Sequence, residues 1–349
     1  MRGVAPAVLL MLAGLASGQP QVAFDKNEEG LKLAYRGESV AAERLYREAI
    51  TLWRDAGPRY EAHLATSELN LAQALSAEGR RPEAAKAMED SLAHFRGSLG
   101  IRDLNTLTAL NLLAGTDVML GNSEAARALY DEALPIEREL FPTDLQLGRT
   151  LIGLAGLEMQ QNRYEEALAP AEEALRVILQ ATGEAGADAA LAYATVAEIH
   201  RGANRPDRAL PLFRKARELY DKALGPDHPR IASILAQEAL VLMAQGKDSM
   251  AERDLLRAIG ILDQRCPGCV NEKFVAETNL ALLRTKQHKY EEADRLLSDA
   301  IGLQERYQHI PGGDLASSLR ALAFVRQKER LYEDAARLQK RADALLTYR

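Results

Sequence analysis

One segment of the chain recurs at an almost constant interval. Residues 37–49, Gly-Glu-Ser-Val-Ala-Ala-Glu-Arg-Leu-Tyr-Arg-Glu-Ala, return at residues 121–133 as Gly-Asn-Ser-Glu-Ala-Ala-Arg-Ala-Leu-Tyr-Asp-Glu-Ala. We call the first residue of each copy the turn position, and it recurs at intervals of 42, 42, 41, 42, 42, 42 and 42 residues. The turn positions are Gly37, Gly79, Gly121, Asn162, Asn204, Gly246, His288 and Arg330. Such a period identifies stacked supersecondary units, each of which buries its apolar face against its neighbours.

Small side chains occupy three fixed places in every unit. Alanine stands five residues after each turn position, and Gly, Ala or Ser stands twelve residues after and seven before it, at 24 positions in all. Because alanine fills 59 of 349 positions, eight alanines in one fixed register would arise by chance about once in a million. Those alanines are Ala42, Ala84, Ala126, Ala167, Ala209, Ala251, Ala293 and Ala335. Small residues let helices approach closely, so each unit is predicted to be a helix, a tight turn and a second helix.

The composition favours the same architecture. The chain has six phenylalanines and one tryptophan, Trp53, and a core of mostly small side chains needs the close backbone contact that helices make with one another. Gly or Asn at six of the eight turn positions suits a left-handed backbone there. Lys and Arg total 44 against 50 Asp and Glu, a formal net charge of -6, which gives no electrostatic reason to expect a nucleic acid partner. We therefore predict an all-α fold.

The small-residue pattern resembles that of the tetratricopeptide repeat family, and the 42-residue period resembles the longer variety found in kinesin light chains and many bacterial relatives. Leu-Gly-Pro-Asp-His-Pro-Arg-Ile-Ala at residues 224–232 resembles the segment that joins repeats in that variety. There Gly225 ends one helix, His228 or the aspartate before it can cap the next, and Pro229 suits the first helical turn. The resemblance covers about residues 23–346 and implies a right-handed superhelical solenoid of about eight helix-turn-helix repeats.

The resemblance also implies where a partner binds. In tetratricopeptide arrays the first helices line a concave face, and asparagines there often bind a partner's backbone or carboxylate. Asn70, Asn111 and Asn279 match such positions here, and Leu-Asn70-Leu-Ala and Thr-Asn279-Leu-Ala resemble the kinesin light chain pattern. A side-chain amide donates and accepts hydrogen bonds at once, which suits an extended peptide. The alternative is that these are ordinary solvated asparagines on an exposed helix face.

Residues 1–18 have the pattern of a signal peptide. A basic residue precedes an apolar run that ends at Ala16, and small residues at Ala16 and Gly18 suit cleavage before Gln19. The run is shorter than the roughly 20 residues that a spanning helix needs, so no stable membrane span is expected. We predict that residues 19–349 form the repeat array of a protein exported to the periplasm or outside the cell. The alternatives are a buried N-terminal helix and a cytoplasmic adaptor that retains these residues.

The only two cysteines, Cys266 and Cys269, stand in the segment Arg-Cys-Pro-Gly-Cys-Val. An exported protein meets oxidising conditions, so we predict a structural disulfide at the junction between the sixth and seventh units. A thioredoxin-type redox pair begins a helix that follows a strand, whereas the element before this pair is predicted to be a helix. The alternatives are an exported thiol-disulfide protein that acts through this pair, two free thiols, and half of a metal site.

No other motif points to chemistry. The histidines stand at unrelated places in the repeats, namely His63, His94, His200, His228, His288 and His309. None is paired with a Ser or Cys nucleophile, none has zinc-finger spacing, and the sequence has no Gly-rich phosphate loop. We therefore predict no catalytic residue, no cofactor and no metal. The predicted function is that of a non-catalytic scaffold or adaptor that binds a protein or peptide in a concave groove.

Overall fold

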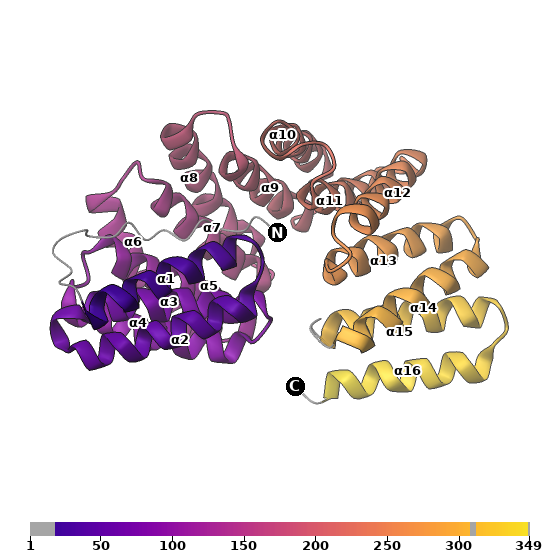
Figure 1. Cartoon of the computed structure of the whole chain (residues 1–349). Helices are drawn as coiled ribbons and strands as arrows, with labels where there is room; N and C mark the ends of the chain where they lie inside the picture. Colours follow the sequence, from indigo (N-terminus) through magenta and orange to yellow (C-terminus); the bar gives the residue numbers. More distant parts are fainter. Residues whose placement is uncertain (1–17, 308–311, 348–349) are drawn as a thin grey trace. The chain divides into compact units, whose positions relative to one another are not determined.

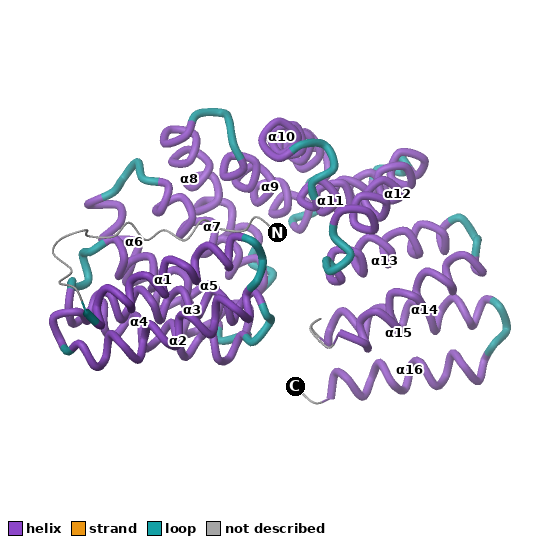
Figure 2. The backbone as a smooth tube through the Cα atoms, in the orientation of Figure 1, coloured by secondary structure: helices purple, strands orange, loops and turns teal. Residues whose placement is uncertain are grey.

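The computed structural model describes residues 18–307 and 312–347. Helices fill most of this range, and no strand occurs in it (Figure 2). The sixteen described α-helices alternate as first and second helices of eight hairpins. The first helices are α1 (Gln19–Tyr35), α3 (Glu61–Ala77), α5 (Leu104–Leu120), α7 (Leu145–Gln160), α9 (Ala187–Gly202), α11 (Pro229–Ala244), α13 (Val270–Lys286) and α15 (Gly312–Lys328). The second helices are α2 (Ser39–Ala56), α4 (Arg81–Ser98), α6 (Ser123–Leu140), α8 (Tyr164–Thr182), α10 (Pro206–Leu224), α12 (Asp248–Arg265), α14 (Tyr290–Tyr307) and α16 (Tyr332–Thr347). The prediction of an all-α solenoid of helical hairpins is confirmed.

A left-handed residue joins the two helices of every hairpin. The backbone angle φ is positive at all eight turn positions. Glycine and asparagine adopt this conformation most readily, and they account for six of the eight. The other two are His288, with φ of 61°, and Arg330, with φ of 65°. The hairpin geometry is therefore kept even where the sequence lacks a residue that favours it.

The small residues bring the two helices of each hairpin together, as predicted. All of the 24 small positions are buried except Ala335, which is half-buried in the last hairpin. The contact is close at Gly30, where an added Cβ would lie 2.7 Å from Cε1 of Tyr46. Because Tyr46 is itself fully buried, any side chain at residue 30 would displace a packed ring.

Polar side chains cap the helix that follows three of the junctions between hairpins. His228 directly precedes α11, and its Nδ1 accepts a hydrogen bond of 3.2 Å from the backbone nitrogen of Arg230. Pro229 is the first residue of that helix. Asp103 and Asp144 cap α5 and α7 in the same way, at 2.8 and 2.7 Å. This confirms the sequence-based interpretation of the Gly-Pro-Asp-His-Pro junction as a helix stop followed by a capped helix start.

The chain divides into two compact units, residues 1–177 and residues 178–349, with the boundary inside α8. We call them the N-terminal unit and the C-terminal unit and describe each by itself. Large buried side chains such as Trp53, Phe95 and Tyr130 fill the core of the N-terminal unit. Phe213 and Leu297 are among those that fill the C-terminal unit.

Within each unit, contacts join several first helices of neighbouring hairpins. These contacts join α1 to α3 and α5 to α7 in the N-terminal unit, and α9 to α11, α11 to α13 and α13 to α15 in the C-terminal unit. Second helices of neighbouring hairpins make no comparable contact within the described residues. Figure 1 shows how the last hairpins, α13–α14 and α15–α16, follow one another side by side. We call the side of each unit on which the first helices lie the first-helix face.

None of the helices in the described ranges combines the length and the apolar character that crossing a bilayer requires. The predicted signal peptide lies outside the described residues, apart from Gly18.

Candidate functional site

The three asparagines predicted to bind a partner stand at two different helix positions. Asn70 and Asn279 lie nine residues before their turn positions, whereas Asn111 lies ten before its own. One residue turns a helix by about 100°, so the two positions point in different directions. Asn70 and Asn279 are only 2% and 7% exposed, while Asn111 is half-buried. The expectation that the amides are solvated is therefore wrong for Asn70 and Asn279, because the adjacent first helices cover that side of the helix.

Asn70 belongs to a buried hydrogen-bond chain in the first two hairpins. Its Nδ2 donates to Oδ1 of Asn27 at 3.1 Å, and Oγ of Ser67 donates to the same oxygen at 3.0 Å. The indole nitrogen of Trp53 donates to Oγ of Ser67 at 3.1 Å. The chain links α1, α2 and α3, so Asn70 has a structural role. Its role in binding a partner stays a prediction.

Asn111 lies against a fully buried carboxyl group. Its Nδ2 donates to Oε1 of Glu137 at 2.9 Å and to Oγ1 of Thr150 at 2.5 Å. Glu137 belongs to the second helix α6, and its side chain reaches in among α5 and α7. Burial raises the pKa of the Glu137 carboxyl, and hydrogen bonds with Thr150, Asn111 and Gln146 oppose that shift. Asn111 therefore supports a buried acid, in addition to any contact that it makes with a partner.

Two cavities lie between neighbouring second helices, on the side away from the predicted asparagines. The larger, about 480 Å³, lies between α2 and α4 over α3, and the smaller, about 200 Å³, lies between α10 and α12 over α11. An arginine on the wall of each cavity forms an ion pair. Arg54 contacts Glu68 at 3.0 Å in the larger cavity, and Arg217 of the smaller contacts the buried Glu238 at 2.7 Å. No motif in the sequence marks these cavities.

An apolar stripe crosses the first-helix face of the C-terminal unit. The residue six before the turn position is Leu240 in α11, Leu282 in α13 and Phe324 in α15. Leu282 and Phe324 are 41% and 46% exposed, and Leu240 is half-buried. We call these three residues the apolar stripe. No motif in the sequence marks the stripe, although the repeat register that locates the buried alanines also locates these three residues.

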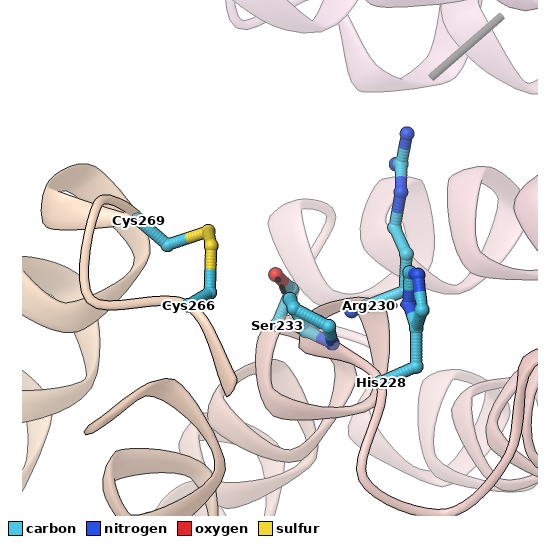
Figure 3. Close-up of a disulfide and its surroundings, with 6 residues drawn as sticks. His228, Arg230, Ser233, Cys266 and Cys269 are labelled. Atoms are coloured by element: carbon cyan, nitrogen blue, oxygen red, sulfur yellow. Dashed lines mark hydrogen bonds between the residues drawn. A yellow bond between two sulfur atoms is a disulfide. The ribbon is translucent and has the colours of Figure 1, made fainter. Parts of the chain in front are cut away.

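A disulfide joins Cys266 and Cys269 in the loop between α12 and α13 (Figure 3). Cys266 directly follows α12, and Cys269 directly precedes α13. Near them, Arg265 forms an ion pair of 3.5 Å with Asp227 of the preceding junction, while His228 and its neighbours begin α11. The bond thus spans one junction, at a place where a second contact ties that junction to the previous one. Whether the pair has a redox function stays a prediction.

The sequence predicts neither a metal site nor a catalytic site. Within the described residues, no group of three or more His, Cys, Asp or Glu side chains is placed to hold a metal ion. The absence of a catalytic or cofactor site stays a prediction.

A family model described as tetratricopeptide repeat matches residues 63–139, 105–180 and 188–264, which together exceed half of the chain. The chain therefore belongs to the tetratricopeptide repeat family, and the predicted resemblance is confirmed. No curated protein sequence matches the chain.

Solved structures share the fold at low sequence identity. A signal transduction ATPase with a tetratricopeptide repeat sensor from Pyrococcus horikoshii is 12% identical with a TM-score of 0.62, and the match covers 95% of this chain but 48% of that one. The chain thus spans about half the length of that ATPase. A Rap protein complexed with Competence and Sporulation Factor is 15% identical with a TM-score of 0.60, over 94% of this chain and 98% of that one. Kinesin light chain repeats from Podosopora anserina are 18% identical with a TM-score of 0.51, over 59% of this chain and 98% of that one.

Proposed function

We propose that the chain is a non-catalytic interaction scaffold or adaptor that binds a peptide or protein segment on its first-helix face. The observation that carries this proposal is the apolar stripe, because large apolar side chains hold one repeat position on three adjacent helices, exposed at Leu282 and Phe324 and half-buried at Leu240. Apolar surface that repeats in this way is typical of a binding surface rather than of scattered surface residues. The Rap protein, a fold neighbour, was crystallised with Competence and Sporulation Factor, so the fold is compatible with such a role.

Selection of displayed random peptides of about 12 residues against the purified chain tests this proposal. Peptides selected on the wild type should lose binding to a Leu282→Glu variant, because a charge in the apolar stripe opposes apolar contact. Leu256→Glu is the matched control, since Leu256 is 50% exposed on the second helix α12 of the same unit. Peptides that ignore the first-helix variant and respond to the control would contradict the proposal.

We also propose that the protein is exported and works in the cell envelope or outside the cell. The support is the order of basic residue, apolar run and small residues in residues 1–18. N-terminal sequencing of the protein recovered from expressing cells should begin at Gln19. A protein that keeps Met1 and stays in the cytoplasm would favour the cytoplasmic adaptor instead.

The other alternative is an exported thiol-disulfide protein that uses Cys266 and Cys269. Titration of the reduced protein with a thiol reagent distinguishes the two roles. A structural pair should show ordinary thiol pKa values of about 8.5, whereas an oxidoreductase would show one thiol pKa well below that value.

A further inference from the structure

We infer that the apolar stripe binds an extended acidic peptide that carries an apolar side chain at every third residue. The inference rests on the proposed function and names the class of partner for the C-terminal unit.

The expected spacing of apolar residues along the ligand follows from the packing of the first helices. α11 contacts α13, and α13 contacts α15, so Leu240, Leu282 and Phe324 stand at the same height on three adjacent helices. Packed helices lie about 8–10 Å apart. An extended or polyproline-type chain advances about 3.1–3.3 Å per residue, so three residues cover about 9–10 Å. One apolar side chain in every three therefore meets each helix in turn.

The charge comes from the residues that surround the stripe. The stripe lies within the stretch from thirteen to two residues before each turn position. This stretch comprises residues 233–244 in α11, 275–286 in α13 and 317–328 in α15. The exposed charged side chains in these stretches are Lys286, Arg320 and Lys328, which are all cations. The acids of the same stretches, Glu238 and Glu277, are buried. The exposed charges that these three stretches themselves contribute beside the stripe are positive, which favours acidic residues between the ligand's apolar ones.

Of the three exposed cations, Lys328 is the one available to a ligand carboxylate. Lys286 pairs with Asp248 at 2.7 Å and Arg320 pairs with Asp343 at 2.8 Å. Lys328 has no carboxylate partner among the described residues, and its Nζ lies 5.0 Å from the centre of the Phe324 ring. A ligand carboxylate beside the apolar residue that covers Phe324 would therefore meet an ammonium group that no described acid neutralises.

The N-terminal unit lacks this arrangement. The residue six before the turn is Leu31 in α1 but Gln73 in α3, Gly115 in α5 and Gly156 in α7, so no apolar side chain continues from α1 across the next helices. An added Cβ at Gly115 or Gly156 would meet nothing within 4 Å, so these places are open and carry no apolar side chain. The inferred site is thus confined to the C-terminal unit.

The test uses synthetic probes and the full chain. The probe is the acetylated peptide amide Tyr-Glu-Leu-Glu-Glu-Leu-Glu-Glu-Leu-Glu, and a matched peptide has lysine in place of every glutamate. We expect the acidic peptide to bind more tightly than the basic one by isothermal titration. Leu282→Ser and Phe324→Ser should each weaken binding about fivefold to tenfold, because each removes apolar area from the contact. Leu256→Ser, on the second helix α12, should leave it unchanged.

The charge is tested separately. Lys328→Glu should weaken binding of the acidic peptide and flatten its dependence on salt. Lys340→Glu is the matched control, because Lys340 is an exposed lysine on the second helix α16. Equal effects of both variants would show that only net charge matters, and would overturn the assignment of Lys328 to the site.

The ligand's conformation is tested with proline. Replacing one glutamate between two leucines by proline should preserve binding by an extended ligand. Loss of binding, with a helical circular dichroism signal from the bound parent peptide, would show a helical ligand and overturn the inference.

Different results would contradict the proposed function and the inference about the apolar stripe. Selected peptides that ignore the apolar stripe but depend on Met119, exposed on the first helix α5, would overturn this inference and leave the proposed function standing. Peptides that depend on no first-helix residue would overturn both.

Discussion

Arg330 is a residue whose side chain does not suit its backbone. It holds a left-handed turn with φ of 65°, a conformation in which a Cβ is unfavourable and glycine is free of strain. Arg330→Gly should therefore stabilise the chain by about 0.5–1 kcal/mol. Urea unfolding measures the change. The control is Glu329→Gly at the preceding residue, whose φ is not positive, and which should destabilise. Stabilisation by both or neither would contradict the strain argument.

Glu137 is a fully buried acid whose Oε2 has no hydrogen-bond partner among the described residues. Burial raises its pKa, so its contribution to stability is present below the unfolded pKa of about 4.3 and is lost as pH rises through the folded pKa. Glu137→Gln keeps the shape and removes the charge. The variant should be more stable than the wild type by about 1–2 kcal/mol at about pH 7, and the gain should vanish near pH 4.

Thermal unfolding at both pH values checks this prediction. Glu238→Gln is the control, because Glu238 is also buried but pairs with Arg217 at 2.7 Å, and its loss leaves that cation without its buried partner. Burial also raises the pKa of Glu238, but Arg217 opposes that shift, so the control should gain less stability at about pH 7 than Glu137→Gln. A Glu137→Gln variant that is destabilised at neutral pH would show that the carboxyl is ionised in the folded protein.

Asn70 illustrates why burial changes a prediction made from sequence alone. An exposed amide could be removed at little cost, but Asn70 is buried and donates to Asn27. Asn70→Ala should cost about 1–3 kcal/mol, because Oδ1 of Asn27 loses a donor and a small cavity forms. Chemical denaturation of the variant and the wild type measures this change in the free energy of unfolding. An unchanged stability would mean that the buried hydrogen-bond chain contributes nothing.

At the scale of elements, ion pairs recur where the second helix of one hairpin meets the first helix of the next. The pairs join the residue six after one turn position to the residue four before the next. They are Arg127 with Glu158, Glu252 with Arg284 at 2.8 Å, and Asp294 with Arg326 at 2.8 Å. The cation stands on the second helix in the N-terminal unit and on the first helix in the C-terminal unit. Leu210 and Leu242 fill the same two places in another hairpin pair.

The reversed polarity predicts that one pair can be swapped. Arg284→Glu should cost about 2–4 kcal/mol, because it places a buried acid against Glu252 and Glu292. Adding Glu252→Arg should recover at least half of that loss, as in the Arg127–Glu158 arrangement. Arg284 also lowers the pKa of Glu252 to about 2. The ion pair therefore stabilises the folded protein at pH values above the unfolded pKa of about 4.3, and this stabilisation is lost as the pH falls toward 2. A double variant as unstable as the single one in urea would contradict the swap.

The repeat register predicted most of the fold, because it depends on short-range constraints. Ala209 and its equivalents allow two helices to approach closely, and Gly121 and its equivalents mark where the chain reverses. The same register could not separate Asn70 from Asn111, since a difference of one residue changes which neighbour a side chain meets. Glu137 shows the same limit. Its partners come from two other helices, and their approach depends on the packing of whole hairpins.

At the scale of the whole molecule, charge and surface differ between the two units. Residues 19–182 carry 17 basic and 26 acidic residues, a net charge of -9, whereas residues 183–349 carry 26 and 24, a net charge of +2. The division of the chain inside α8 was not predicted, because the repeat continues through it. The apolar stripe lies on the more basic C-terminal unit. An acidic ligand is thus attracted by the unit as a whole and held by three of its helices.

Hydrogen–deuterium exchange of the full chain, with and without a selected peptide, tests the central claim most directly. Binding on the first-helix face should slow exchange in α11, α13 and α15, around Leu240, Leu282 and Phe324. It should leave α12 and α14 unchanged. Protection confined to second helices, or to the loops that join hairpins, would contradict the claim that the first-helix face is where this protein binds its partner.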